Sequence, residues 1–316
     1  MTKSVKLLDK TSLKQDVCFN EYSVEVYSSV SEKRIDILPY LKYPQDFHGD
    51  INVDQIVRFK NTFEDLIGKF EDNLHIWKPN KLAKKNIFIL EHHFDEAKQL
   101  MDDINRLAQR TITNPKLYDD RNFCLDYYKK AEHGYSLLRK YQNHFGIGKK
   151  TGTPVSLERA GLITTRLALG LDKNSKINNE IRVVTKRTHL KGEPDTYLTV
   201  TIKWRDIDIL EKYVKNKTVE LTDFVNPASG ASTAAFIIAV INSGNKPTNV
   251  IHRSICLTCQ GTLFMKTALS KLKIKSVFYS VGECDELNSL YYLTGNRTVG
   301  DAGHLLRHFL PDWYRQ

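Results

Sequence analysis

Apolar residues in the first third of the chain recur at the spacing of an amphipathic helix. Five of them would lie on one face of a helix over residues 54–76: Ile56, Phe59, Phe63, Ile67 and Phe70. Residues 92–110 and 121–142 repeat this periodicity with charged residues between the apolar ones, and predict two further helices. The pattern predicts a mainly helical first half of the chain.

The pattern changes after the Gly-rich segment 144–156, which has the composition of a loop or a boundary. Short runs rich in β-branched and aromatic residues predict strands over 181–187, 196–204, 218–225, 249–258 and 275–281. Apolar segments between them predict helices over 232–244 and 261–273. Alternating strands and helices are typical of an α/β fold, so we expect a mainly parallel sheet flanked by helices.

Composition narrows the class of protein. Of the 316 residues, 41% are hydrophobic, and no apolar run is long enough for a membrane helix, so we expect no membrane partner. Five scattered cysteines do not form a disulfide framework, and the first residues lack an apolar signal core, so we expect a cytoplasmic location. The net charge is +10, of which residues 151–316 contribute +7 (22 basic against 15 acidic). This excess fits nucleic acid, an anionic small molecule or simply a solvated basic surface.

The stretch "NPASGASTAAF", residues 226–236, joins a predicted strand to a predicted helix. A helix N-terminus offers unpaired amide N–H groups to an anion, and small side chains let a phosphate approach the backbone. The small residues are Ala228, Ser229, Gly230, Ala231 and Ser232, and Thr233 adds a hydroxyl. Taken alone, the same residues are more typical of a simple helix cap.

Four other segments change that balance, because with this turn they resemble the uracil phosphoribosyltransferase family, of the type I phosphoribosyltransferase fold, in chain order. "ASGAS" (228–232) resembles the family's phosphate loop, and "ERAGL" (158–162) resembles its Arg-Ala-Gly-Leu segment. "KRTHLKGEPDTYL" (186–198) and "CQGTLFMKTAL" (259–269) follow the pattern of two further segments. The most specific is 284–314, where Leu-Asn, Tyr and Gly-Asp-Ala-Gly occur in the family's order. The resemblance covers about two-thirds of the chain. It implies a uracil-phosphoribosyltransferase-like domain over residues 101–316, preceded by a mainly helical N-terminal extension of unknown role, residues 1–100.

The resemblance implies transfer of a phosphoribosyl group from 5-phosphoribosyl pyrophosphate (PRPP) to uracil or a related pyrimidine, giving UMP and pyrophosphate, as in pyrimidine salvage. It implies Mg²⁺ as cofactor and at least a dimer. Residues 228–233 would hold the ribose 5′-phosphate, after an acidic residue that we assign to Asp223. Arg159 and Arg187 would face the pyrophosphate, with Arg187 counted as catalytic. The base would lie against Tyr292, Leu293, Gly300, Ala302 and Gly303. Asp301 would be the catalytic and metal-binding residue beside the ribose.

Departures from the family pattern leave alternatives open. Counting back from Gly230 places the family's loop acid at Phe224, so Asp223 requires a one-residue insertion. The second glycine of the loop is Ala231, and the second aspartate of the last motif is His304. These changes favour a degenerate relative that binds a nucleotide or nucleic acid in a regulatory or scaffolding role. A third hypothesis, after the active enzyme and the degenerate relative, is a protein that binds nucleic acid through its basic surface.

Overall fold

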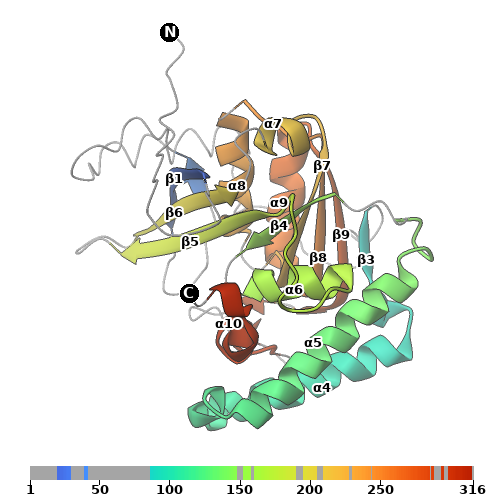
Figure 1. The fold of residues 1–316 in the computed structure, drawn as a ribbon. Helices are drawn as coiled ribbons and strands as arrows, with labels where there is room; N and C mark the ends of the chain where they lie inside the picture. Colours follow the sequence, from blue (N-terminus) through green and yellow to red (C-terminus); the bar gives the residue numbers. More distant parts are fainter. Residues whose placement is uncertain are drawn as a thin grey trace.

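The fold is seen in a computed structural model (Figure 1). It describes residues 20–29, 39–41, 86–147, 152–157, 160–189, 195–204, 209–227, 230–242, 244–284, 286–287, 293–294 and 298–314. Several expectations fall outside these residues: the helix over 54–76, and the site residues Arg159, Ala228, Ser229 and Tyr292. The division of the chain at residue 100 stays a prediction.

A nine-stranded sheet forms the centre of the described structure, in the order β2-β1-β6-β5-β4-β7-β8-β9-β3. Its strands are β1 (Asn20–Ser29), β2 (Pro39–Leu41), β3 (Ile87–Ile89), β4 (Thr153–Leu157), β5 (Ile181–His189), β6 (Asp195–Trp204), β7 (Thr218–Val225), β8 (Asn249–Thr258) and β9 (Lys275–Cys284). The strands from β5 to β3 in that order are parallel to one another. Strands β6, β1 and β2 extend one edge by antiparallel pairing.

Helices cover both faces of this sheet (Figure 1). One layer holds α4 (Asp95–Thr113), α5 (Arg121–Tyr141) and α6 (Ala160–Leu169), and the other holds α8 (Ala231–Asn242) and α9 (Cys259–Lys271). The shorter elements are η2 (Leu90–His92), η3 (Pro115–Tyr118), α7 (Ile209–Tyr213), α10 (Ala302–Leu306), η4 (Arg307–Phe309), η5 (Asp312–Tyr314) and a small pair of strands, β10 (Glu286–Leu287) and β11 (Leu293–Thr294). None of the helices in these ranges has the length and apolarity needed to cross a membrane.

The predicted α/β architecture, a mainly parallel sheet flanked by helices, is confirmed. The strands over 218–225 and 249–258 have their predicted bounds, and the helices predicted over 92–110 and 121–142 occur as α4 and α5. Strand β4 begins inside the segment 144–156 that we interpreted as a loop, and its five residues are too few to show a pattern. Strands β1 and β3 join the sheet through long-range pairing, which periodicity does not report.

Close contact between α5 and the sheet depends on a small residue. A Cβ atom on Gly134 would lie 2.4 Å from the Ile255 side chain on β8, so a larger residue would push the helix away. The α5 tyrosines Tyr127 and Tyr135 are fully buried on this face, and their hydroxyls donate to the carbonyl oxygens of Val299 (2.6 Å) and Asp223 (2.8 Å). Helix α5 therefore holds both the C-terminal segment and the end of β7 in place.

A buried ion pair anchors α6 to the start of β5. The Arg166 guanidinium donates to both carboxylate oxygens of Glu180 at 2.9 Å, and both side chains are almost wholly buried. Ser156 on β4 donates to the same carboxylate, and the Trp313 ring lies 5.1 Å from the guanidinium carbon. Since every charged atom has a partner, the pair ties together β4, α6, β5 and the C-terminal turn.

The Glu180→Gln variant should lose about 3–5 kcal/mol of stability, because it leaves the Arg166 charge buried and uncompensated. Urea unfolding followed by circular dichroism measures the change. The control is Glu211→Gln, which removes an exposed partner of Lys215 and should change stability by less than about 1 kcal/mol. Equal effects of the two substitutions would contradict an anchoring role for the buried pair.

Candidate functional site

The strand order reverses between β4 and β7, which are neighbours in the sheet. From β4 the chain passes through α6 to β5 on one side, and from β7 it passes through α8 to β8 on the other. Right-handed crossovers in opposite directions place their helices on opposite faces of the sheet. The two connections therefore diverge at the carboxyl edge of β4 and β7, and such a switch point is where α/β sheets bind ligands.

The turn from β7 to α8 lies at this switch point. Strand β7 ends at Val225, the Asn226–Pro227 peptide bond is cis, and Gly230 has a φ of 81° before α8 begins at Ala231. Ala234 N donates to Gly230 O at 2.8 Å, so the amides of residues 231–233 precede the first intrahelical hydrogen bond. The predicted sequence of strand, small-residue turn and helix is thus present, with the geometry of a helix N-terminus at its centre.

The Asn226 side chain holds the turn from beneath. It is 1% exposed, and its Nδ2 donates to Leu221 O at 3.0 Å, which fixes Oδ1 as an acceptor. That oxygen accepts from the Thr233 hydroxyl at 3.2 Å and lies 3.3 Å from His252 Nδ1. The Thr233 hydroxyl, which we expected on the phosphate, therefore joins the first turn of α8 to the end of β7.

His252 on β8 is neutral in this position. Burial lowers its pKa to about 3, and its ring stacks on Phe278 with centroids 4.4 Å apart. Because Asn226 Oδ1 is an acceptor, the ring proton must be on Nδ1. The opposite nitrogen, Nε2, has no hydrogen-bond partner among the described residues. The imidazole thus acts as a donor to the turn without placing a charge beneath it.

Strand β8 also fixes the backbone of the turn. Ser254 Oγ donates to Asn226 O at 3.0 Å, and Asn226 N donates to Cys256 O at 3.0 Å. Thr258 N donates to Pro227 O at 3.0 Å. We call these contacts, together with those of Asn226, Thr233 and His252, the Asn226 brace. A turn with its polar groups satisfied from below can hold one geometry toward a ligand without reorganising.

Asp223 is the acidic residue beside this turn. Phe224 stacks on Tyr127 of α5 with ring centroids 5.0 Å apart, so the alternation along a strand directs Asp223 to the opposite face. The backbone N of Phe224 donates to Asp223 Oδ1 at 2.7 Å, while burial raises the pKa of this carboxyl to about 7. Phe224 is fully buried, and the assignment of Asp223 as the acidic residue of the turn stays a prediction.

The predicted base segment lies on the α5 side of the same edge. Tyr127, which stacks on Phe224, donates to Val299 O, and Thr298 N donates to Asn105 Oδ1 at 2.8 Å. Gly300 has a φ of 68°, and α10 begins at Ala302 with Gly303 in its first turn. Tyr127 therefore connects residues 298–303 to the end of β7 through two direct contacts.

Asp301 has a structural role in this segment. Its Oδ1 accepts from His304 N at 3.0 Å as the cap of α10, and its Oδ2 contacts His304 Nδ1. Among the described residues, no hydrogen bond or ion pair joins Asp301 to the β7–α8 turn. To reach a metal ion or a ribose, this carboxylate would have to exchange at least its contact with the His304 ring.

The remaining predicted residues are placed only by their backbone. Arg187 lies near the carboxyl end of β5 opposite Leu198 of β6, at the same edge as the turn. Leu293 pairs with Leu287 in the small sheet, and Ala231 is the first residue of α8. The side chains of Arg187, Leu293 and Ala231 are outside the described set, so their roles stay predictions.

The described residues supply no ready metal site. No three His, Cys, Asp or Glu side chains lie together within the described ranges. Asp301 is engaged by α10, and Asp223 has a raised pKa, so neither is a strong ligand as it stands. Mg²⁺ binds readily through phosphate oxygens and keeps several waters. A Mg²⁺ ion at this edge would therefore depend on phosphate oxygens of a ligand for its coordination.

Sequence reasoning missed Asn226, His252, Ser254 and Thr258. A signal was available, since the three β8 residues all occupy even positions, and a repeat of two along a strand marks one face. What the sequence does not report is that this face lies under Asn226 of the neighbouring strand.

No protein-family model matches the chain, and no curated protein sequence matches it. Several solved structures do.

One is the AQ2163 protein from Aquifex aeolicus, with 18% identity, a TM-score of 0.43, and coverage of 70% of this chain and 97% of that one. Another is the adenine phosphoribosyltransferase from Giardia lamblia complexed with 9-deazaadenine, with 13% identity, a TM-score of 0.30, and coverage of 55% and 83%. A third is the orotate phosphoribosyltransferase from Mycobacterium tuberculosis in complex with 5-phospho-alpha-D-ribosyl 1-diphosphate, with 11% identity, a TM-score of 0.32, and coverage of 62% and 94%. These similarities are too low to assign a residue role or an activity, so the roles of residues rest on this chain's own geometry.

The raised pKa of Asp223 predicts a pH-dependent contribution to stability. From its ordinary value of 3.8 up to about 7, the folded protein keeps a proton that the unfolded chain has released. Ionisation therefore opposes folding, and this group's contribution to stability falls as the pH rises through that window.

The Asp223→Asn variant, neutral at every pH, should be more stable than the parent at about pH 8, by more than about 1 kcal/mol, and close to it below about pH 4. Thermal unfolding across the pH range measures the difference. The control is Asp119→Asn, which changes an exposed carboxylate paired with Arg307. A difference between parent and Asp223→Asn that does not vary with pH would contradict a buried, protonated carboxyl.

Proposed function

We propose that this chain is a phosphoribosyltransferase that uses PRPP and a nucleobase, with uracil or a related pyrimidine as the expected base. The single observation that supports it most is the Asn226 brace, which preorganises a helix N-terminus at the switch point of a parallel sheet. The ordered sequence resemblance supports the same reading, because its phosphate loop coincides with this turn.

The turn has the properties that a phosphate site requires. Amides at a helix N-terminus and the helix dipole favour a dianion, and Gly230 leaves the backbone open to close approach. The neutral His252 donates to Asn226 without adding charge, so the attraction for a phosphate comes from the backbone of the turn. In this proposal residues 228–233 bind the ribose 5′-phosphate, and Thr233 acts by holding Asn226.

The proposed reaction is a substitution at the anomeric carbon. The bond between C1 of the ribose and the diphosphate oxygen breaks, and its electron pair leaves with the diphosphate. A ring nitrogen of the base forms the new bond to C1, and the proton of that nitrogen passes to water. Mg²⁺ bound to the diphosphate would neutralise its charge as it leaves.

The chain's own contribution is positioning and charge stabilisation. Arg159 and Arg187 are proposed to face the diphosphate, and the β5 position of Arg187 at the carboxyl edge is compatible with this. Residues 292–303 are proposed to bind the base through backbone groups, which suit the alternating donors and acceptors of a uracil edge. Tyr127, buried between Phe224 and Val299, would set the separation between base and phosphate.

One observation favours a second candidate, a degenerate relative that binds a nucleotide or nucleic acid without turnover. Both carboxylate oxygens of Asp301, the predicted catalytic residue, already have partners in α10, the backbone N and the ring of His304. A protein that only binds PRPP or a nucleotide needs the Asn226 brace but not a free Asp301.

Turnover is tested with PRPP and Mg²⁺ against a panel of pyrimidine and purine bases, uracil first. We expect pyrophosphate release together with a nucleotide identified by mass. Binding of PRPP without any product would favour the degenerate alternative. Absence of PRPP binding would contradict both readings of the turn.

The Thr233→Val variant tests the brace itself. Losing one partner of Asn226 should raise the KM for PRPP by about three- to tenfold and leave the fold intact. The control is Thr111→Val on α4, since Thr111 is equally buried and its hydroxyl also donates within the structure, to Ala108 O. If both variants change KM alike, or if neither does, the brace does not position the phosphate turn.

A further inference from the structure

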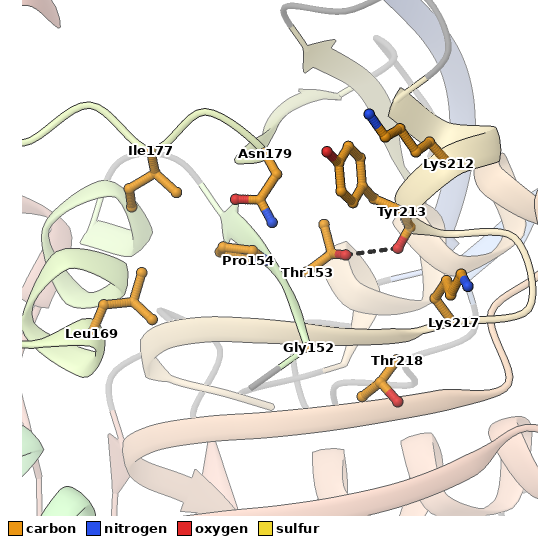
Figure 2. A pocket seen from close by; sticks show the side chains of 10 residues that line it. All are labelled: Gly152, Thr153, Pro154, Leu169, Ile177, Asn179, Lys212, Tyr213, Lys217 and Thr218. Carbon is orange, nitrogen blue, oxygen red and sulfur yellow. Dashed lines mark hydrogen bonds between the residues drawn. The ribbon is translucent and has the colours of Figure 1, made fainter. Parts of the chain in front are cut away.

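A cavity lies at the opposite, amino-terminal edge of the strands that carry the candidate site. Its volume is about 590 Å³, which is within the range of small-molecule pockets. Figure 2 shows its lining: Gly152, Thr153, Pro154, Leu169, Ile177, Asn179, Lys212, Tyr213, Lys217 and Thr218. Gly152, Thr153 and Thr218 mark the beginnings of β4 and β7, whereas the β7–α8 turn follows the end of β7. The two sites are therefore separated by the length of the strands.

The walls of this cavity are fixed by local contacts. A Cβ on Gly152 would lie 2.8 Å from Thr218 O, so the close approach of the two strands at this end requires glycine. The Thr153 hydroxyl donates to Tyr213 O at 2.7 Å and ties α7 to β4. The segment between α6 and β5 forms the other wall, which carries Ile177 and Asn179.

The lining has distinct apolar and basic sides. Figure 2 shows Leu169 and Ile177 on one side, Lys212 and Lys217 on the other, and Asn179 and Tyr213 between them.

The described residues that line the cavity include no acidic side chain. The ammonium of Lys212 lies 5.1 Å from the Tyr213 ring centroid, and neither lining lysine pairs with a carboxylate among the described residues. Lys215, between them in sequence, is instead neutralised by Glu211 at 3.0 Å. Two uncompensated ammonium groups beside an aromatic ring favour an anion with a planar, partly apolar body.

We propose that this amino-edge cavity binds a free nucleoside monophosphate. Its phosphate would lie at Lys212 and Lys217, its planar base against Tyr213 and the apolar side, and the Asn179 amide would donate and accept at the base edge. The inference does not depend on phosphoribosyl transfer, because it uses none of the residues of the carboxyl-edge site.

Hydrogen–deuterium exchange on the full chain, with UMP, uridine or inorganic phosphate as probe, locates the ligand. UMP should protect peptides that cover residues 177–179 and 212–218. Protection restricted to residues 226–234, or none at all, would overturn the proposal. Equal protection of 212–218 by uridine would also overturn it, because the phosphate would then contribute nothing.

Substitution of the lysines gives the matched comparison. The double variant Lys212→Gln/Lys217→Gln should weaken the UMP affinity read from peptide 212–218 by about tenfold or more. The Lys215→Gln control, with the same loss of charge nearby, should behave as the parent. Comparable weakening by Lys215→Gln would show general surface attraction and refute the site. Turnover with PRPP, measured on the same variants, reports separately on the proposed enzyme.

Discussion

The parallel pairing of β4 with β7 is the constraint on which the rest of the described structure depends. The chain leaves these two strands in opposite directions, through α6 toward β5 and through α8 toward β8. Right-handed connections must then lie on opposite faces, which opens a crevice at the carboxyl end of the pair. The carboxyl end carries the braced turn, and the amino end carries the cavity beside Lys212 and Lys217.

Buried polar side chains in this protein fix the relative positions of neighbouring strands, helices and turns. The Asn226 amide, the Thr233 hydroxyl and the neutral His252 ring form one network under the turn, and each is almost wholly buried. The buried ion pair of Arg166 with Glu180 likewise fixes α6 against the start of β5. The hydrogen bonds of Thr233 and His252 to Asn226 restrict the turn to one arrangement, whereas His252 Nε2 has no partner among the described residues. In the proposed enzyme that arrangement keeps the phosphate turn fixed while the chemistry occurs at the ribose.

The proposed active site joins two layers that the sequence separates widely. The turn belongs to the α8 side of the sheet, whereas residues 298–303 pack on α5. Tyr127 links them, since it contacts Phe224 with its ring and Val299 with its hydroxyl. This single side chain connects the core of the sheet to the proposed base segment. A substitution of Tyr127 would therefore alter the packing of Phe224 and the position of residues 298–303.

By itself the sequence determined the class of fold, most helices and strands, and the strand–turn–helix unit over residues 218–242, because these depend on local periodicity and composition. It could not place β3 and β4, whose few residues carry too little pattern, or the strand order, which follows from long-range pairing. The tertiary structure alone decided that Phe224 packs on Tyr127, which directs Asp223 to the opposite face of β7. It also decided that Thr233 and His252 hold Asn226, because that contact requires β7, α8 and β8 to meet.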